Sequence, residues 1–367
     1  MLKVLQLVYN WGQGGYESYV ATLATMLHNK ECKFYIAYSE RLPMPEKVKE
    51  LGIEAFEIPM KSPCDLSAAR KVAKLCKELS IDTIQTHFIR ERYIAALSKL
   101  MGNKARLIYT SHVVVPKSAA LKFTNRLVSS REYKMIAVCY AGREQMLEEG
   151  LKQDKIKVIH NGVNVSYWSE EIQSTIREEF GIAQDEFVMT TTGRFNELKG
   201  QAFFIESIKE LDLITQGQNI KYKVILAGDG ELLEQCKKLA ESLGVADKII
   251  FTGFRKDIKN ILYGSDLYVS PSKTEALSMS IIEALACSLP AISTDVGGTS
   301  EVINNENDCG ILVNYGDRHE LAESILTVMK DKNLYQRLKN NAYKTAYEKF
   351  NLDNTVRETY NLYKGEG

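Results

Sequence analysis

The sequence predicts an α/β protein made of two doubly wound domains, each built on a parallel β-sheet. The length of 367 residues suits two domains of ordinary size. Short β-rich apolar runs alternate with amphipathic, helix-period segments, which is typical of parallel sheets. This alternation occurs twice, and the two series meet near the turn dipeptide of Asn161–Trp168. We therefore expect one domain over residues 1–163 and another over residues 164–350.

The strands and helices follow from this alternation. In the first half the predicted strands are Lys3–Val8, Phe34–Tyr38, Glu54–Ile58, Thr83–Thr86, Arg106–Thr110, Met135–Val138 and Lys157–Ile159, and the amphipathic stretches between them include Glu17–His28, Leu66–Leu79 and Tyr93–Leu100. In the second half the predicted strands are Phe187–Thr191, Lys223–Leu226, Ile249–Thr252, Leu267–Val269, Ala291–Ser293 and Ile311–Val313. The last stretch, Asn333–Gly367, has helical character and no strand signal.

The composition is that of a soluble globular protein. Hydrophobic residues make up 45% of the chain and charged residues 26%. No run approaches the roughly 18 apolar residues of a membrane-spanning helix, and the N-terminus lacks the pattern of a cleavable signal. Seven cysteines, an odd and scattered set without Cys-x-x-Cys spacing, favour free thiols in a reducing cytosol over disulfides or a zinc site. We expect a cytoplasmic protein.

Charge is distributed unevenly between the two halves. Residues 1–165 hold 25 Lys and Arg against 16 Asp and Glu, and the remainder has the opposite imbalance. Such asymmetry suggests different partners for the halves, or an attraction between them. In the basic half, Val113–Lys134 interleaves apolar residues with cations, which fits either a solvated helix or an amphipathic surface that binds anionic lipid on the inner face of a membrane. The cations proposed for that surface are Lys117, Lys122, Arg126 and Arg131.

The stretch Ser270–Glu301 places two carboxylates, Glu275 and Glu283, around a predicted strand-to-helix turn. Glu275 follows the strand in a polar loop, and Glu283 lies about two turns into an Ala-rich helix. A helix that begins at a strand end exposes unpaired backbone N–H groups, which bind anions. A nearby carboxylate can accept hydrogen bonds from vicinal hydroxyls. The order of these features predicts a site for a phosphorylated sugar, although the spacing alone also fits a solvated helix face.

Arg194 and Lys199 place two cations just beyond the predicted strand Phe187–Thr191. In open α/β sheets ligands bind at this carboxyl edge. A guanidinium and an ammonium together can neutralise a pyrophosphate and stabilise its departure without a metal. The alternative is a surface pair near a helix start, which is disfavoured because cations there oppose the helix dipole. No Asp-x-Asp metal motif follows a strand, so we expect no metal.

Two glycine-containing turns carry weaker signals. The turn with Gly14 and Gly15 follows the first predicted strand, and its spacing breaks both the dinucleotide fingerprint and the Walker loop. Glycines there let the backbone approach a phosphate, or simply form a tight turn. Gly253 and Phe254 follow a strand of the second half, where an ordinary turn would have the same sequence.

Five histidines are present, and two of them follow predicted strands of the first half. These are His87 and His112. A lone histidine is more often a hydrogen-bonded structural residue than a catalytic one, so both interpretations stay open at this point. The other three, His28, His160 and His319, are interpreted as structural or surface residues.

The motifs taken together resemble the signature of the family 4 glycosyltransferases over nearly the whole chain. The matching elements are Gly14-Gly15-x-Glu17, His112, Arg194…Lys199-Gly200 and Glu275…Glu283. The resemblance implies the GT-B fold, in which two Rossmann-like domains face each other. It further implies an acceptor-binding domain over residues 1–163, a nucleotide-sugar-binding domain over 164–350, and a final helix, 351–367, that crosses back to the first domain near Phe350–Asn354.

The resemblance also implies an activity and a role for each residue. The reaction would transfer a hexose or N-acetylhexosamine, with retention of anomeric configuration, from a nucleotide-diphosphate sugar to a glycan or lipid-linked acceptor in polysaccharide biosynthesis. UDP is the favoured nucleotide. No metal, cofactor or nucleic acid would take part. Arg194 and Lys199 would hold the diphosphate, and Gly14 and Gly15 would lie on its phosphate side. Glu283 would bind the ribose, and Gly253 and Phe254 would contact the base. Glu275, with the backbone of Leu277, Ser278 and Met279, would hold the donor sugar, and His112 would contact the transferred sugar. Glu17 and His87 would lie on the acceptor side.

The sequence departs from the family's pattern directly after Glu275. The family usually has Gly-Phe-Gly there, whereas this chain has Ala276-Leu277-Ser278. The change implies either a different donor sugar or reduced activity, and the first is favoured because both acids and both cations remain. A nucleotide-sugar epimerase on the same scaffold, and a catalytically silent partner subunit of a glycosyltransferase, are the alternatives.

Overall fold

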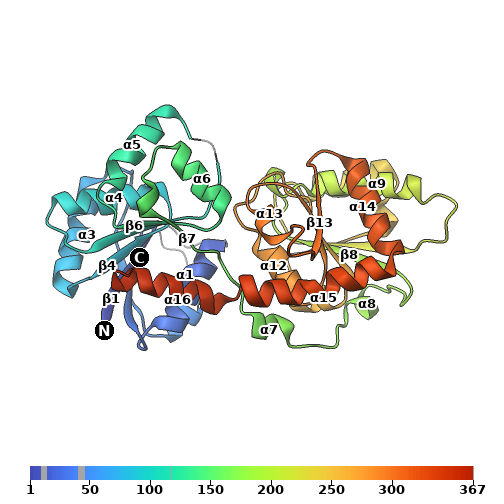
Figure 1. Cartoon of the computed structure of the whole chain (residues 1–367), viewed down its shortest axis with the longest axis horizontal. Coiled ribbons are helices and arrows are strands. Elements are labelled where there is room, and N and C mark those ends of the chain that lie inside the picture. The colour runs from blue at the N-terminus through green and yellow to red at the C-terminus, as the bar shows by residue number, and fades with distance from the viewer. Residues whose placement is uncertain (10–14, 40–45, 116, 367) are drawn as a thin grey trace. The chain divides into compact units, whose positions relative to one another are not determined.

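The computed structural model describes residues 1–9, 15–39, 46–115 and 117–366. The chain divides into two compact units, of which the first comprises Met1–Asn161 with Asp353–Gly367 and the second Gly162–Leu352. Each unit contains one all-parallel sheet with helices packed against it (Figure 1). The predicted α/β class with two Rossmann-like sheets is therefore confirmed.

The first unit has a seven-stranded sheet in the order β3-β2-β1-β4-β5-β6-β7. Its strands are β1 (Leu2–Val8), β2 (Cys32–Tyr38), β3 (Glu54–Glu57), β4 (Thr83–Thr86), β5 (Arg106–Ser111), β6 (Lys134–Ala137) and β7 (Ile156–Val158). Its helices are α1 (Gly15–Leu27), α2 (Glu46–Glu50), α3 (Leu66–Leu79), α4 (Ile89–Leu100), α5 (Ala119–Ser129), α6 (Tyr140–Glu148), a 3₁₀ turn at Gln153–Lys155, and α16 (Leu352–Lys364).

Side-chain alternation along β1 decides which helices cover each face of this sheet. Leu5 and Leu7 are buried in an apolar cluster that includes residues of α3 and α4. Gln6, between them, points to the opposite face. There its amide contacts the hydroxyl of Tyr363 from α16 at 3.1 Å. One face of the sheet is thus apolar, whereas the face toward α16 contains buried polar groups.

The second unit has a six-stranded sheet in the order β10-β9-β8-β11-β12-β13. Its strands are β8 (Phe187–Thr192), β9 (Tyr222–Ala227), β10 (Ile249–Gly253), β11 (Leu267–Ser270), β12 (Ala291–Thr294) and β13 (Gly310–Val313). Its helices are α7 (Val165–Ser169), α8 (Ile176–Glu179), α9 (Gln201–Ile214), α10 (Leu233–Leu243), α11 (Ile258–Tyr263), α12 (Met279–Ala286), α13 (Thr299–Val302), α14 (Arg318–Lys330) and α15 (Lys332–Lys349), with 3₁₀ turns at Glu197–Lys199 and Ala246–Lys248.

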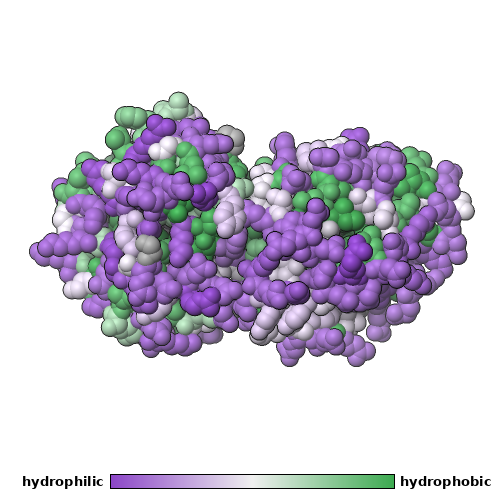
Figure 2. Space-filling model, in the orientation of Figure 1, coloured by the Kyte–Doolittle hydropathy of each residue, from purple (hydrophilic) through white to green (hydrophobic). Residues whose placement is uncertain are grey.

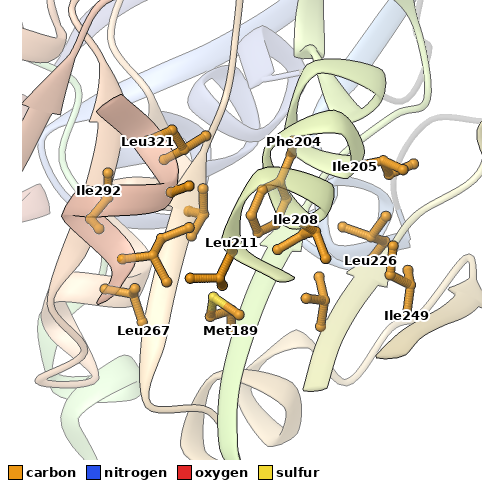
Figure 3. Close-up of a cluster of buried hydrophobic side chains, with 14 of the residues drawn as sticks. Met189, Phe204, Ile205, Ile208, Leu211, Leu226, Ile249, Leu267, Ile292 and Leu321 are labelled. Atoms are coloured by element: carbon orange, nitrogen blue, oxygen red, sulfur yellow. The ribbon is translucent and has the colours of Figure 1, made fainter. Parts of the chain in front are cut away.

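The core of the second unit forms where α9 packs on the sheet. Phe204, Ile208 and Leu211 lie on one face of α9 and are fully buried. They point toward Met189 of β8 and its strand neighbours (Figure 3). Each such side chain contributes about 1.5–3 kcal/mol by leaving water. This packing fixes β8, and with it the loop that follows the strand.

The chain leaves the first unit and returns to it through two adjacent segments. The Val163 N–H donates to the carbonyl of Phe350 at 3.0 Å, and the Leu352 N–H donates to that of Val163 at 2.9 Å. A Cβ on Gly162 would lie 2.6 Å from the Asn351 backbone, so only glycine fits this approach. Helix α15 ends at Lys349 and α16 begins at Leu352, which confirms the predicted return near Phe350–Asn354. The final helical stretch is thus two helices rather than one.

Candidate active site

Some of the residues predicted for the site follow the strands at which each sheet reverses its order, whereas His112 follows β5 and Phe254 follows β10. In the first unit that reversal lies between β1 and β4, and in the second between β8 and β11. Ligands of open α/β sheets bind outside the carboxyl ends of the strands at such switch points. His87 follows β4, Lys199 follows β8 and Glu275 follows β11. The topology alone therefore singles out the loops that carry these three residues.

Lys199 and Glu275 form an ion pair at the switch point of the second sheet. The Lys199 Nζ lies 2.6 Å from Glu275 Oε1, and the side chains are 32% and 11% exposed. Burial disfavours the ammonium charge, but the carboxylate of Glu275 outweighs it, so the pKa of Lys199 lies above its ordinary value. The lysine is therefore charged at neutral pH and can meet an anionic ligand.

Backbone packing brings these two loops together. Gly200 has φ +67°, and a Cβ there would lie 1.9 Å from the carbonyl oxygen of Pro271. The Lys273 N–H donates to the carbonyl of Leu198 at 2.8 Å. Asn196 caps the 3₁₀ turn by accepting from the Lys199 N–H at 3.0 Å. Lys199 thus lies in a short 3₁₀ turn before α9, not in the helix itself.

Ser272 and the glycine-containing turn after β12 fix the loop of Glu275. The Ser272 hydroxyl donates to Glu275 Oε1 at 2.8 Å. Gly297 has φ +57°, and a Cβ there would lie 1.7 Å from the Glu275 carbonyl oxygen. The neighbouring Gly298 N–H donates to the Ala276 carbonyl at 2.9 Å. The turn after β12 therefore supports the loop after β11, a role that the Gly-Gly pair could have signalled.

Glu283 lies in α12, two turns after the loop of Glu275. Burial raises the pKa of this carboxyl group to about 7, so it is partly protonated at neutral pH. The N-cap of α12, Ser278, forms no side-chain cap hydrogen bond, so its hydroxyl does not satisfy the first N–H groups of the helix. Perturbed carboxyl pKa values cluster at functional sites, so this shift agrees with the role predicted for Glu283.

Two of the three residues that depart from the family's pattern are buried. Leu277 and Ser278 are buried, at 6% and 2% exposure, whereas Ala276 and Met279 are partly exposed. The Ser278 hydroxyl lies 3.2 Å from that of Ser280.

Arg194 does not join the ion pair of Lys199. Its side chain is 70% exposed, and its Nε lies 3.4 Å from a carboxylate oxygen of Glu231, in the segment after β9. Phe195, next to it, is buried in the core. The two cations therefore follow the same strand, as predicted, but they have separate partners.

The turn after β10 places an aromatic side chain on the surface. Gly253 has φ +68°, and its carbonyl accepts from the Gly228 N–H at 2.9 Å. Phe254 is 59% exposed, which is unusual for a phenylalanine. The chain thus presents an apolar ring beside the carboxyl edge of the sheet.

In the first unit His87 and His112 lie in contact. Their Nδ1 and Nε2 atoms are 3.0 Å apart, and His87 Nε2 lies 2.9 Å from Gln6 Oε1. Burial lowers the pKa of His112 to about 3, and burial together with His112 places that of His87 well below its ordinary value. Both rings are therefore neutral at physiological pH. Sequence reasoning missed Gln6, whose signal was a lone polar residue inside an apolar strand.

The glycine-rich turn after β1 falls largely outside the described residues. Gly14 is not described. Gly15 begins α1, and Glu17 lies in its first turn, with its side chain outside the described part. The predictions for these three residues stay predictions.

The basic segment differs from the prediction at one position. Lys117 is 5% exposed at its side chain and lies 2.7 Å from the buried carboxylate of Glu149. The prediction that Lys117 faces a membrane is therefore wrong, because this ammonium is held inside an ion pair. Arg126 is exposed, although its Nε donates to the Glu149 carbonyl at 2.7 Å. Lys122 is partly exposed and Arg131 is exposed.

Helix α5 turns its polar side inward. Its buried residues are Asn125 and Ser129, whereas Phe123 and Leu127, one turn apart, are 62% and 54% exposed. Figure 2 shows hydrophobic atoms on the surface of the first unit where Figure 1 places α5. Cations and apolar side chains thus share an exposed surface.

The described residues contain neither a membrane-spanning helix nor a metal-binding cluster. Within the described ranges, no helix has the length and apolar character needed to cross a bilayer. Among those same residues, no group of three or more His, Cys, Asp or Glu is arranged to hold a metal ion.

Solved structures with similar coordinates show which fold this chain has. A glycosyltransferase from Rickettsia africae ESF-5 superposes with a TM-score of 0.88 at 22% identity, covering 100% of this chain and 98% of that one. The Anabaena protein HepE, in complex with UDP, superposes with a TM-score of 0.87 at 20% identity, covering 99% and 100%. The fold is thus the GT-B fold of glycosyltransferases.

Sequence comparison narrows the class to a family. The model described as "Glycosyltransferase Family 4" matches residues 13–167, and "Glycosyl transferases group 1" matches residues 172–345. The chain belongs to the family 4 glycosyltransferases. It is 23% identical over 320 residues to the N-acetyl-alpha-D-glucosaminyl L-malate synthase of Bacillus anthracis, covering 86% of this chain and 82% of that one.

A second relative is similar over almost the full length of both chains. It is the N-acetylgalactosamine-N,N'-diacetylbacillosaminyl-diphospho-undecaprenol 4-alpha-N-acetylgalactosaminyltransferase of Campylobacter jejuni, at 24% identity over 374 residues and 98% of each chain. The glycosyltransferase class predicted from the motifs is confirmed.

Proposed function

We propose that this chain is a retaining, metal-independent glycosyltransferase that uses a UDP-sugar. It moves a hexose or N-acetylhexosamine to a glycan or lipid-linked acceptor in cell-surface polysaccharide biosynthesis. The observation that carries the proposal is the Lys199–Glu275 pair at the switch point of the second sheet. A charged ammonium beside a carboxylate matches a ligand with a phosphate next to sugar hydroxyls.

The names of similar proteins support the substrate classes. Two of them name acceptors linked to diphosphoundecaprenol, from Campylobacter jejuni and Escherichia coli. The structure of Anabaena HepE contains UDP, and another contains UDP-glucose. These names favour UDP as the nucleotide and a lipid-linked acceptor for this chain.

Each side chain has a proposed part in donor binding. Lys199 and Arg194 hold the diphosphate and offset the charge that develops on it as it leaves. Glu283 accepts hydrogen bonds from the ribose hydroxyls. Glu275, with the first backbone N–H groups of α12, holds the sugar. Phe254, an exposed ring, stacks on the base.

The transfer step needs no protein nucleophile in this proposal. The bond from the anomeric carbon to the phosphate oxygen breaks, and the acceptor oxygen bonds to the same face of that carbon. The acceptor's proton passes to the leaving phosphate. His112 is neutral and contacts the transferred sugar by hydrogen bonding.

A thermal-shift panel of UDP-, GDP- and ADP-sugars tests the donor assignment. At one hundred times the dissociation constant, the cognate donor stabilises the protein by about 2.7 kcal/mol. Lys199→Ala and Arg194→Ala reduce that shift. If both variants keep the full shift, the phosphate assignment is wrong.

The alternatives predict different products from the same donor. A nucleotide-sugar epimerase changes the donor sugar without an acceptor, and a silent partner subunit releases no nucleotide. The side chains of Leu277 and Ser278 are buried, which favours a loop after Glu275 that can still bind a donor. Acceptor-dependent release of UDP, with analysis of the sugar left on the donor, separates the three.

We further propose that α5 binds an anionic membrane surface peripherally. Phe123 and Leu127 insert among acyl chains, while Lys122, Arg126 and Arg131 meet lipid headgroups. Lys117 takes no part because Glu149 holds it.

Co-sedimentation with phosphatidylglycerol vesicles tests this surface. Phe123→Ser with Leu127→Ser reduces binding, and so does added salt. Leu213→Ser, which removes an exposed leucine of the second unit, leaves binding unchanged. Equal sedimentation with pure phosphatidylcholine, or no loss in the double variant, rejects the proposal.

A further inference from the structure

The serine that begins α12 has the backbone of an ordinary helix cap, but its side chain does not act as one. Ser278 has φ −76° and ψ 104°, and among the described residues its hydroxyl accepts from no N–H at the start of α12. Asp65 begins α3 with nearly the same backbone, φ −71° and ψ 97°, and accepts a hydrogen bond from the Ala68 N–H. Ser118, which begins α5, accepts from the Leu121 N–H at 3.4 Å, so a serine side chain is long enough to cap. Rotation of one side chain therefore separates Ser278 from a capping arrangement.

A second serine holds the Ser278 hydroxyl in its present direction. The hydroxyl oxygens of Ser278 and Ser280 lie 3.2 Å apart, and Ser278 is buried. The side chain of Ser280 also hydrogen-bonds the hydroxyl of Tyr268. That hydroxyl in turn lies 3.1 Å from the Thr192 hydroxyl at the end of β8. A hydroxyl network of this kind keeps each member in one rotamer, whichever oxygen donates.

The direction of the Ser278 hydroxyl decides whether it competes for the first N–H groups of α12. A serine at the N-cap normally accepts from the second or third helical N–H, which here belong to Ser280 and Ile281. In the observed rotamer the hydroxyl does not occupy them, whereas in the capping rotamer it would compete with a ligand. The family usually has a glycine in place of Ser278, and glycine carries no such competitor.

We propose that Ser280 is a positioning residue for donor binding, because it holds the Ser278 hydroxyl away from the start of α12 and so keeps the N–H groups there open to the donor sugar. The proposal rests on the proposed function, in which those N–H groups hold the sugar together with Glu275. It accounts for a serine where the family usually has a glycine.

Isothermal titration of the full chain with UDP-glucose and UDP-N-acetylglucosamine tests the proposal, and the tighter ligand of wild type is used for the variants. In Ser280→Ala the Ser278 hydroxyl loses its partner and turns to the helix start. Affinity for the UDP-sugar then falls about fivefold, an amount typical of one cap. Affinity for UDP without a sugar stays within about twofold, because Arg194, Lys199 and Glu283 are unchanged.

A second substitution, at Ser278, separates this role from a structural one. Ser278→Ala combined with Ser280→Ala leaves no hydroxyl to cap α12, so the double variant binds the UDP-sugar about fivefold more tightly than Ser280→Ala alone. A network that merely stabilised the fold would make the double variant no better. Ser280→Thr, which keeps the hydroxyl, also binds more tightly than Ser280→Ala. The matched control is Ser242→Ala, which removes an exposed hydroxyl of α10 that donates to the Leu239 carbonyl at 2.8 Å and leaves both affinities unchanged.

Failure of this proposal and failure of the proposed function give different results. If wild type binds neither UDP-sugar, the donor assignment is wrong and the role of Ser280 falls with it. If wild type binds a UDP-sugar but Ser280→Ala keeps its full affinity, or the double variant stays as weak as Ser280→Ala, the proposed function stands and the role of Ser280 is rejected. An equal loss of affinity for UDP alone in Ser280→Ala also rejects that role.

Discussion

The two switch points of this molecule differ in the kind of polar group that each contains. At the second sheet an ammonium and a carboxylate form a partly exposed ion pair, with a further carboxyl group of raised pKa in the next helix. At the first sheet two neutral histidines are connected to buried amides. Fixed charges suit a diphosphate, whereas neutral donors and acceptors suit hydroxyl groups.

The difference teaches how one architecture can divide two tasks. Both sheets are parallel and both reverse their strand order, so topology places a ligand site on each. The side chains at the strand ends then decide the chemistry. Burial favours the neutral form at both sites, because it lowers the pKa of His112 and raises that of Glu283.

The largest expected effect is the loss of the charged group at the second site. Lys199→Met lowers kcat/KM by about 10³-fold, the usual result of removing one group that stabilises developing charge. Steady-state kinetics with the cognate donor measures it. Lys273→Met is the control, since this neighbouring lysine pairs with exposed Glu197 at 2.7 Å. Equal activity in the two variants would show that the ion pair is structural.

The next effect concerns the neutral site. His112→Gln lowers kcat about 10²-fold, because the sugar loses a positioned hydrogen-bonding group in the transition state. At saturating donor, the kcat of wild type shows no titration of His112 near pH 6.5, since the pKa of His112 is lowered to about 3. His319→Gln, at an exposed position on α14, serves as control. A histidine-like inflection that disappears in His112→Gln would contradict the neutral assignment.

A smaller effect follows from the pKa of Glu283. Between pH 6 and 8 this group loses its proton. The carboxylate accepts hydrogen bonds from the ribose hydroxyls better than the protonated acid does, so affinity for the cognate UDP-sugar rises about tenfold. Glu283→Gln binds weakly and without this pH dependence. Glu234→Gln, which changes an exposed glutamate of α10, is the control and behaves as wild type. Isothermal titration measures both.

The free protein responds to pH in the opposite direction. Because the folded pKa of Glu283 lies above its unfolded value, this group's contribution to stability decreases as pH rises from about 4.5 through about 7. Donor affinity that falls with rising pH in wild type would show that the protonated form is the binding form.

The smallest effect tests the ion pair itself. Glu275→Gln frees Lys199 from its partner, so UDP without a sugar binds about threefold more tightly, in keeping with the modest energy of a partly exposed pair. The cognate UDP-sugar gains no such advantage, because the carboxylate that holds its sugar is gone. Weaker binding of both ligands would show that the pair orients Lys199 instead of competing for it.

Local sequence patterns were enough to predict the strands and to propose which residues at their ends form the site. Short apolar, β-rich runs identified the strands and period-3.6 hydrophobicity the helices, because the strands of a parallel sheet are buried on both faces and its helices on one. Lys199 and Glu275 could be proposed from their positions after strands, since parallel strands end at a common edge. Their direct contact at 2.6 Å could not, because the sequence does not say which loops touch.

Other site features depend on residues that are remote in the chain. Lys117 has the pattern of a surface lysine, yet it is buried because Glu149 lies opposite it in the fold. Gln6 and Tyr363 lie at opposite ends of the sequence, and only the return of α16 to the first unit brings them within 3.1 Å.

The sequence by itself determined the two parallel-sheet units, their family and the charged residues at the strand ends, because these depend on local periodicity and on order along the chain. Only the tertiary structure decided which groups are paired or buried: the Lys199–Glu275 pair, the neutral His87–His112 pair and the buried side chain of Lys117. The physical reason is that pairing and burial are set by distances of a few ångströms between remote segments.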